Sequence, residues 1–120
     1  MSQDKFIGEL EHMVLLVVLQ LKDEAYGAQI RQYLAEQIER DLSIGALYTT
    51  LERLEQKGLL IATLGEATAE RGGRAKKYFE LTAQGSQALR RSKNALDQLW
   101  TGVSLPVTTF KLMTTKDFLS

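Results

Sequence analysis

The chain is organised around one segment, Ser43-Ile-Gly-Ala-Leu-Tyr-Thr-Thr-Leu-Glu-Arg-Leu-Glu-Gln-Lys-Gly58. Its apolar side chains recur at helical spacing, which predicts an α-helix with one buried face. Ser43 is placed to cap the N-terminus of this helix, and Gly58 is placed to end it in a left-handed conformation. The positions predicted to be buried are Ile44, Leu47, Tyr48, Leu51 and Leu54.

The face opposite these apolar side chains is predicted to lack acidic groups, because Glu52 and Glu55 fall at its sides. Small, hydroxyl and basic side chains in this arrangement suit a helix that lies against phosphates and base edges. An ordinary amphipathic surface helix would have a similar pattern. The side chains predicted on this face are Ala46, Thr49, Thr50, Arg53 and Lys57.

Two further helices are predicted before this segment. Residues 9–21 are apolar on nearly every side, so we expect that helix to be covered twice, with a second subunit as one candidate cover. An amphipathic helix follows at about residues 26–40, and short links join all three. Three closely joined helices, the last with a polar outer face, have the order of a helix-turn-helix.

After Gly58 the apolar spacing alternates, which predicts a β-hairpin formed by residues 59–64 and 75–81. The hairpin tip, Arg71-Gly72-Gly73-Arg74, continues into Lys76 and Lys77, so positive charge gathers there. This composition is typical of a wing that reaches a phosphate backbone. A solvated charged hairpin is the alternative.

Thr82 is predicted to cap a last helix over about residues 83–101. Its apolar and small side chains recur about every 3.5 residues, which marks a seam for another helix. We expect a second copy of the chain to cover the seam, and packing onto the first helix of the same chain is the alternative. The seam consists of Gly85, Leu89, Ser92, Leu96, Leu99 and Val103.

Composition restricts the classes of function. The 120 residues suffice for one domain, and the absence of cysteine excludes disulfides and thiolate chemistry. The formal net charge is zero, but residues 1–70 carry 12 acidic and 6 basic side chains, whereas residues 71–120 carry 3 acidic and 9 basic. A basic surface can therefore exist on an acidic body.

An enzyme, a metal site and a cofactor are not expected, because the lone His12 has only Glu9 and Glu11 nearby and lacks a further ligand cluster. The polar N-terminus and the short apolar run at residues 13–19 predict a cytoplasmic protein without a membrane span.

Together these residues resemble the PadR family of bacterial transcriptional regulators, which are winged-helix proteins. The resemblance covers about residues 8–99. Thr49 departs from it, because the family commonly has proline there, and this leaves open how the helix is presented to DNA. The matching motifs are Tyr26-Gly27, Leu42-Ser43-x-Gly45-x-Leu47-Tyr48, Leu51-x-Arg53-Leu54-Glu55-x-x-Gly58-Leu59, Gly73-Arg74, Lys77-Tyr78 and Leu81-Thr82-x-x-Gly85.

The resemblance implies a mainly α fold with a small β-hairpin: a winged helix-turn-helix domain at residues 1–82 and a C-terminal dimerisation helix at residues 83–103. The tail at residues 104–120 has no assigned structure. The implied function is that of a dimeric transcriptional repressor that binds double-stranded DNA sequence-specifically, with the third helix in the major groove and the wing on the backbone. A winged-helix module that binds another protein without DNA is the alternative.

The resemblance also implies roles for particular side chains. DNA contacts are expected from Ser43, Ala46, Thr49, Thr50, Arg53 and Lys57 of the third helix, and from Arg71, Arg74 and Lys76 of the wing. Homodimer contacts are expected from Leu15, Leu19, Leu89, Leu96, Leu99 and Val103. A small aromatic or phenolic effector is a candidate ligand between the subunits, at Leu96 and Trp100.

Overall fold

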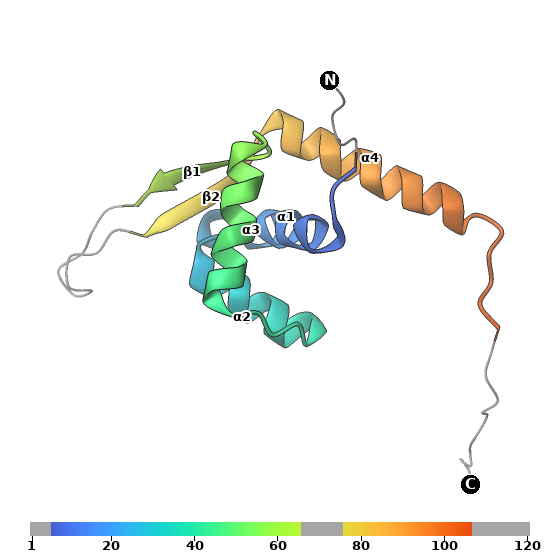
Figure 1. Cartoon of the computed structure of the whole chain (residues 1–120), viewed down its shortest axis with the longest axis horizontal. Helices are drawn as coiled ribbons and strands as arrows, with labels where there is room; N and C mark the ends of the chain where they lie inside the picture. The colour runs from blue at the N-terminus through green and yellow to red at the C-terminus, as the bar shows by residue number, and fades with distance from the viewer. Residues whose placement is uncertain (1–5, 66–75, 107–120) are drawn as a thin grey trace, which may run out of the picture.

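The computed structural model describes residues 6–65 and 76–106. Its elements, in chain order, are α1 (Glu9–Leu21), the 3-10 helix η1 (Lys22–Glu24), α2 (Gly27–Ile38), α3 (Ile44–Gln56), β1 (Leu60–Leu64), β2 (Lys77–Leu81) and α4 (Ala83–Trp100). Figure 1 shows α1, α2 and α3 grouped together, with the hairpin extending on one side and α4 on the other. The prediction of a mainly α fold with one small hairpin is confirmed.

Local sequence signals set the helix boundaries. Ser43 Oγ accepts a hydrogen bond of 3.0 Å from the Ala46 N–H at the start of α3, and Thr82 Oγ1 accepts one of 2.9 Å from the Gly85 N–H at the start of α4. Both caps replace a backbone acceptor that a helix start lacks. Gly58 has the predicted left-handed backbone, with a φ of 78°. The three terminal signals in the sequence are therefore confirmed.

The second helix is shorter than predicted. It ends at Ile38 rather than near Arg40, because Glu39 takes a left-handed φ of 57° and the Arg40 N–H bonds the Leu34 carbonyl at 3.1 Å. This closes the last turn in the manner of a Schellman-type end.

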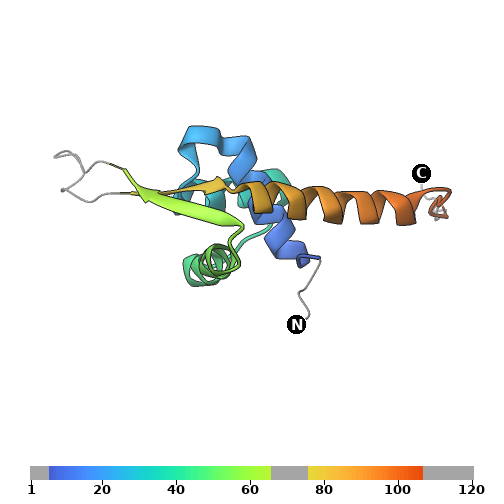
Figure 2. The ribbon, with the colours of Figure 1, turned by 90° about the horizontal axis from the view of Figure 1, so that it is seen from above.

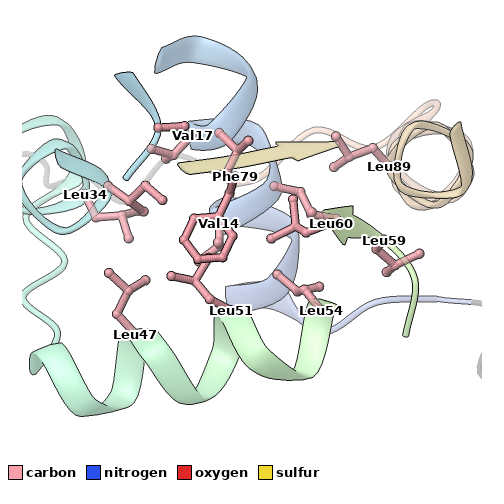
Figure 3. Close-up of a cluster of buried hydrophobic side chains, with 14 of the residues drawn as sticks. Val14, Val17, Leu34, Leu47, Leu51, Leu54, Leu59, Leu60, Phe79 and Leu89 are labelled. Atoms are coloured by element: carbon pink, nitrogen blue, oxygen red, sulfur yellow. The ribbon is translucent and has the colours of Figure 1, made fainter. Parts of the chain in front are cut away.

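One hydrophobic core joins the three helices to the hairpin. In Figure 3, Leu47, Leu51 and Leu54 project from α3 towards α1 and the strands, into a cluster that also holds Val14 and Phe79. The strands pair antiparallel, with Ala62 opposite Phe79 and Leu60 opposite Leu81. Each fully buried leucine of this kind contributes about 1.5–3 kcal/mol. The core therefore fixes how α3 and the hairpin lie relative to each other.

Only the first half of α4 packs against this core. Ala88 and Leu89 are buried, whereas Leu96, Leu99 and Trp100 are exposed. Figure 2 shows the second half of α4 extending away from the other elements. The predicted seam is therefore divided. Its Leu89 end packs within the chain, as the alternative proposed, and its Leu96, Leu99 and Val103 end is uncovered.

Two predicted dimer contacts were wrong. Leu89 is 7% exposed and belongs to the core of its own chain, because the start of α4 packs on α1 and β2. Leu15 is fully buried. Helical spacing places it one turn beyond Glu11 and beside Val14, which both face the interior. Leu19, one turn beyond Leu15 and near the end of α1, is about half exposed.

The predicted hairpin tip at residues 71–74 and the tail from residue 107 onward lie outside the described residues. None of the described helices is both long enough and apolar enough to cross a lipid bilayer.

Candidate nucleic-acid interface

The outer face of α3 differs from the predicted one. Ile44 and Tyr48 are 45% and 37% exposed, so they do not belong to the buried stripe. The buried residues of α3 are instead Leu47, Thr50, Leu51 and Leu54, so the buried direction is turned by about 40–50° around the helix, at about 100° per residue. The solvent-facing side is then centred on Gly45, Thr49, Glu52 and Gln56, all of which are exposed. This face carries Glu52 and is not free of acidic groups, contrary to the prediction.

Thr50 was wrongly placed on the DNA-facing side. Its side chain is 3% exposed, and its Oγ1 donates a 3.1 Å hydrogen bond to the Ala46 carbonyl one turn earlier. A buried hydroxyl satisfied in this way makes no outward contact. Ala46, Thr49 and Arg53 are exposed, as is the cap Ser43, and these four positions remain candidate DNA contacts.

Lys57 is engaged within the chain. Its Nζ lies 2.9 Å from Glu11 Oε2 and 3.2 Å from Glu11 Oε1. Glu11 lies in the first turn of α1 and is 7% exposed, and its Oε1 also accepts a 3.0 Å hydrogen bond from the Gly8 N–H. Lys57 thus balances the negative charge of a buried carboxylate. The sequence did not predict this pairing. A glutamate three residues after a helix N-cap was the available signal, because that spacing reaches back to the cap.

The pKa of Glu11 shows the balance of these contacts. Burial raises the pKa of the carboxyl, but hydrogen bonds from Gly8 and Lys57 and the charges of Lys57 and Arg53 outweigh it, so the pKa lies below the ordinary value for a glutamate. A pKa lowered by folding adds stability above the unfolded-state value, and that stability is lost as pH falls through the folded value.

We therefore expect the free energy of unfolding to fall as pH decreases below about 4.5, and to fall less in Glu11→Gln. Urea unfolding followed by circular dichroism, at about pH 7 and about pH 3, measures both slopes. Glu9→Gln, in the same helical turn, is the control and should retain the wild-type dependence on pH. An equal fall in wild type and Glu11→Gln would contradict this account.

The base of the hairpin is fastened to the start of α2. The Tyr26 and Tyr78 rings meet edge to face with centroids 5.3 Å apart, and the two residues form an isolated β-bridge. Lys76 Nζ lies 4.0 Å from the centre of the Tyr26 ring. Contacts of this kind contribute about 0.5–1 kcal/mol at partly exposed sites. Lys76, a predicted wing contact, therefore lies at the junction of the wing with α2.

Lys77 connects the wing to α3. Its Nζ lies 3.4 Å from Glu55 Oε1, with both side chains partly exposed. Arg71 and Arg74, the other predicted wing contacts, lie outside the described residues.

Tyr48 explains why two sequence motifs occur together. The Tyr48 hydroxyl lies across Gly27, so closely that a Cβ on Gly27 would collide with it. The Tyr26-Gly27 pair at the start of α2 and the Leu47-Tyr48 pair in α3 therefore meet in space. Glycine at position 27 allows the two helices of the helix-turn-helix to approach each other.

A second candidate surface lies along α4. An apolar groove of about 490 Å³ runs between the N-terminal segment, α1 and α4. Phe6, His12, Leu96 and Leu99 line it, and Trp100 is half exposed next to it in sequence. In the part of the chain that the structure describes, no three histidine, aspartate or glutamate side chains gather as a metal ion would require.

Comparisons with known proteins agree with this architecture. The family model described as "Transcriptional regulator PadR-like family" matches residues 15–91. The chain is 36% identical over 77 residues to the transcriptional regulator Rv3488 of Mycobacterium tuberculosis, which covers 64% of this chain and 67% of that protein.

Two solved structures give the same result. A PadR family transcriptional regulator from Eggerthella lenta superimposes with a TM-score of 0.62 at 29% identity, over 78% of this chain and 81% of that one. A PadR-like transcriptional regulator from Bacillus cereus superimposes with a TM-score of 0.63 at 26% identity, over 77% of this chain and 84% of that one.

Proposed function

This chain belongs to the PadR-like family of transcriptional regulators. From that premise we propose that it acts as a homodimeric transcriptional repressor that binds double-stranded DNA. It is a transcription regulator and not an enzyme. The observation that supports DNA binding is the exposed face of α3 beside the hairpin, with Thr49 and Arg53 outward and Lys76 at the base of the wing.

In this proposal α3 enters the major groove. Arg53 makes a bidentate contact with a guanine, as exposed arginines on recognition helices can, Thr49 and Ala46 pack against base edges, and Ser43 faces a phosphate near the helix start. The wing contributes Arg71, Arg74 and Lys76 to the backbone. Because Glu52 shares the outer face of α3, the attraction for phosphate comes mainly from Arg53 and the wing.

We propose that the uncovered half of α4 forms the homodimer contact, through Leu96, Leu99 and Val103, together with Leu19 of α1. All four side chains are about half exposed or more, which is costly for a monomer in water. Residues 1–82 then form the DNA-binding unit and residues 83–103 the dimerisation helix. The groove beside Leu96 and Trp100 would hold a small aromatic effector that releases the repressor.

The proposal is tested by fluorescence anisotropy of a labelled duplex taken from the DNA upstream of the coding region of this protein, titrated at two salt concentrations. Tight, salt-sensitive binding that survives competitor DNA supports a specific regulator. Binding that competitor removes would mean that the operator lies elsewhere. Absence of binding at low salt would favour the protein-interaction module.

Arg53→Ala is expected to weaken binding to the specific duplex by about 1–3 kcal/mol and to relax the preference among sequences. Truncation removes a base contact while leaving the core of α3 intact, since Arg53 is exposed. Competition between the operator and single-base variants measures the preference. Arg90→Ala removes the same charge from an exposed position on α4 and should leave that preference unchanged. Equal effects of the two substitutions would exclude base readout by Arg53.

A further inference from the structure

Lys57 and Glu11 form an ion pair at the end of the proposed DNA-binding helix, although 46 positions separate them in the chain. The Lys57 side chain is 36% exposed and that of Glu11 only 9%. The carboxylate is therefore fixed inside the fold, and the lysine is the movable partner. A second ion pair among the described contacts of α3 joins Lys77 to Glu55. Its N–O distance is longer, at 3.4 Å, and each of its side chains is more exposed than the corresponding one in the Lys57–Glu11 pair.

Lys57 lies one helical turn beyond Arg53 and so on the same side of α3. Arg53 is also close enough for its charge to act on Glu11. An unpaired ammonium at position 57 would stand beside the proposed DNA contact, on a flexible four-carbon stem. In the structure the Lys57 ammonium instead donates charge-assisted hydrogen bonds to both carboxylate oxygens of Glu11.

We propose that Glu11 is a positioning residue that withholds Lys57 from the DNA phosphates and so keeps affinity for non-specific DNA low. The proposal rests on the proposed DNA-binding function. Non-specific affinity depends on the number of cations that replace counterions along the duplex. Removing one cation from that number weakens binding to every sequence by about the same factor and leaves base contacts unchanged, so affinity for non-specific DNA falls while the preference among sequences is kept.

The structure supports retention of the pair when DNA approaches. Lys57 compensates a carboxylate that is almost fully buried, and withdrawal of the lysine would leave that charge inside with the Gly8 N–H as its one remaining hydrogen-bond donor among the described residues. An uncompensated buried charge is strongly unfavourable. A phosphate at the surface, surrounded by water and salt, offers a weaker partner.

The test is the salt dependence of binding to a random-sequence duplex, measured by anisotropy for wild type, Glu11→Gln and Glu9→Gln. Glutamine keeps an oxygen for the Gly8 N–H and removes the charge that holds Lys57. The slope of log K against log salt should become steeper in Glu11→Gln by about 0.9 per bound subunit. Between about 50 and about 200 mM salt, affinity should then fall by about threefold more per subunit than in wild type.

Glu9→Gln is the matched control, because it makes the same change in net charge in the same first turn of α1, where Glu9 faces the groove with α4. Its slope should stay at the wild-type value. The double variant Glu11→Gln/Lys57→Gln should return to the wild-type slope, since the freed lysine is then missing. Thermal unfolding of each variant reports whether the fold is retained.

Lys57→Gln alone tests the same point in a chain that keeps Glu11. A lysine that makes no phosphate contact adds nothing to the slope, so the slope should not change. A decrease of about 0.9 per subunit would show that Lys57 already contacts phosphate, and would overturn the inference. A steeper slope in Glu9→Gln as well, or one that persists in the double variant, would also overturn it.

The failure of this inference is distinguishable from failure of the proposed function. Salt-sensitive wild-type binding whose slope is unchanged in Glu11→Gln would exclude the role of Glu11 and leave the DNA-binding proposal standing. Absence of wild-type binding to any duplex at low salt removes the DNA-binding proposal and this inference with it.

Discussion

Gly85→Ala is expected to lower the free energy of unfolding by about 3 kcal/mol, a large part of the total for a domain of this size. Gly85 is buried in the first turn of α4. A Cβ at this position would overlap the carbonyl oxygen of Leu59 and approach its carbonyl carbon to 3.1 Å. The obstacle is backbone, so no side-chain rotation can relieve the collision.

The Leu59 carbonyl is itself fixed, because it accepts a 3.1 Å hydrogen bond from the Thr82 N–H. The Thr82 hydroxyl donates to the Gly58 carbonyl and accepts from the Gly85 N–H. Moving α4 away to make room would therefore break the junction between α3, β1 and α4. Making that room should therefore cost an amount at the upper end of the range for an overpacked side chain, which is about 1–3 kcal/mol.

Urea unfolding of Gly85→Ala and Gly45→Ala measures this effect. Gly45 is the matched control, since it is also helical and its added Cβ would meet nothing within 4 Å. Alanine there should be neutral, or stabilising by about 0.5–1 kcal/mol, because glycine weakens a helix interior. Equal stabilities of the two variants would show that the contact between Gly85 and Leu59 is not as close as the structure has it.

Leu96→Glu/Leu99→Glu is expected to convert the proposed homodimer into a monomer and to remove most of its affinity for a palindromic operator. The two leucines are 51% and 73% exposed in the single chain. A twofold interface would bury both of them from each subunit, and each is worth about 1.5–3 kcal/mol when buried. The dissociation constant of the dimer should rise by at least about a thousandfold.

Sedimentation equilibrium measures the change in mass, and circular dichroism shows that each subunit remains folded. Ile61→Glu is the control, because Ile61 is a similarly exposed apolar side chain, at 53%, on β1. It should leave the dimer intact. A wild-type chain that is monomeric, or a double variant that still dimerises, would exclude α4 as the dimer contact.

Much of the fold could be predicted because its signals are local. Ser43 and Thr82 cap helices through hydrogen bonds to residues three positions ahead, and Gly58 reverses the chain by its own φ. The change from helical to alternating spacing after Gly58 likewise indicates the strands without knowledge of their neighbours. The order of the elements follows from these signals.

The candidate site was predicted less completely. Ile44 and Tyr48 are apolar, but apolar side chains are often exposed, and counting both as buried rotated the outer face of α3. The error placed Thr50 outside and Glu52 at the side. Spacing gives the period of a helix, while the packing of other elements chooses which part of its circumference is covered.

By itself, therefore, the sequence determined the helices, their ends, the hairpin and the family of this regulator. Tertiary structure decided that Leu15 and Leu89 serve the chain's own core, that the end of α4 is left uncovered, and that Lys57 pairs with Glu11. The physical reason is distance along the chain. A cap or a turn depends on neighbours within about four residues, whereas the Lys57–Glu11 pair joins α3 to α1 across 46 positions and exists only once the core has brought those helices together.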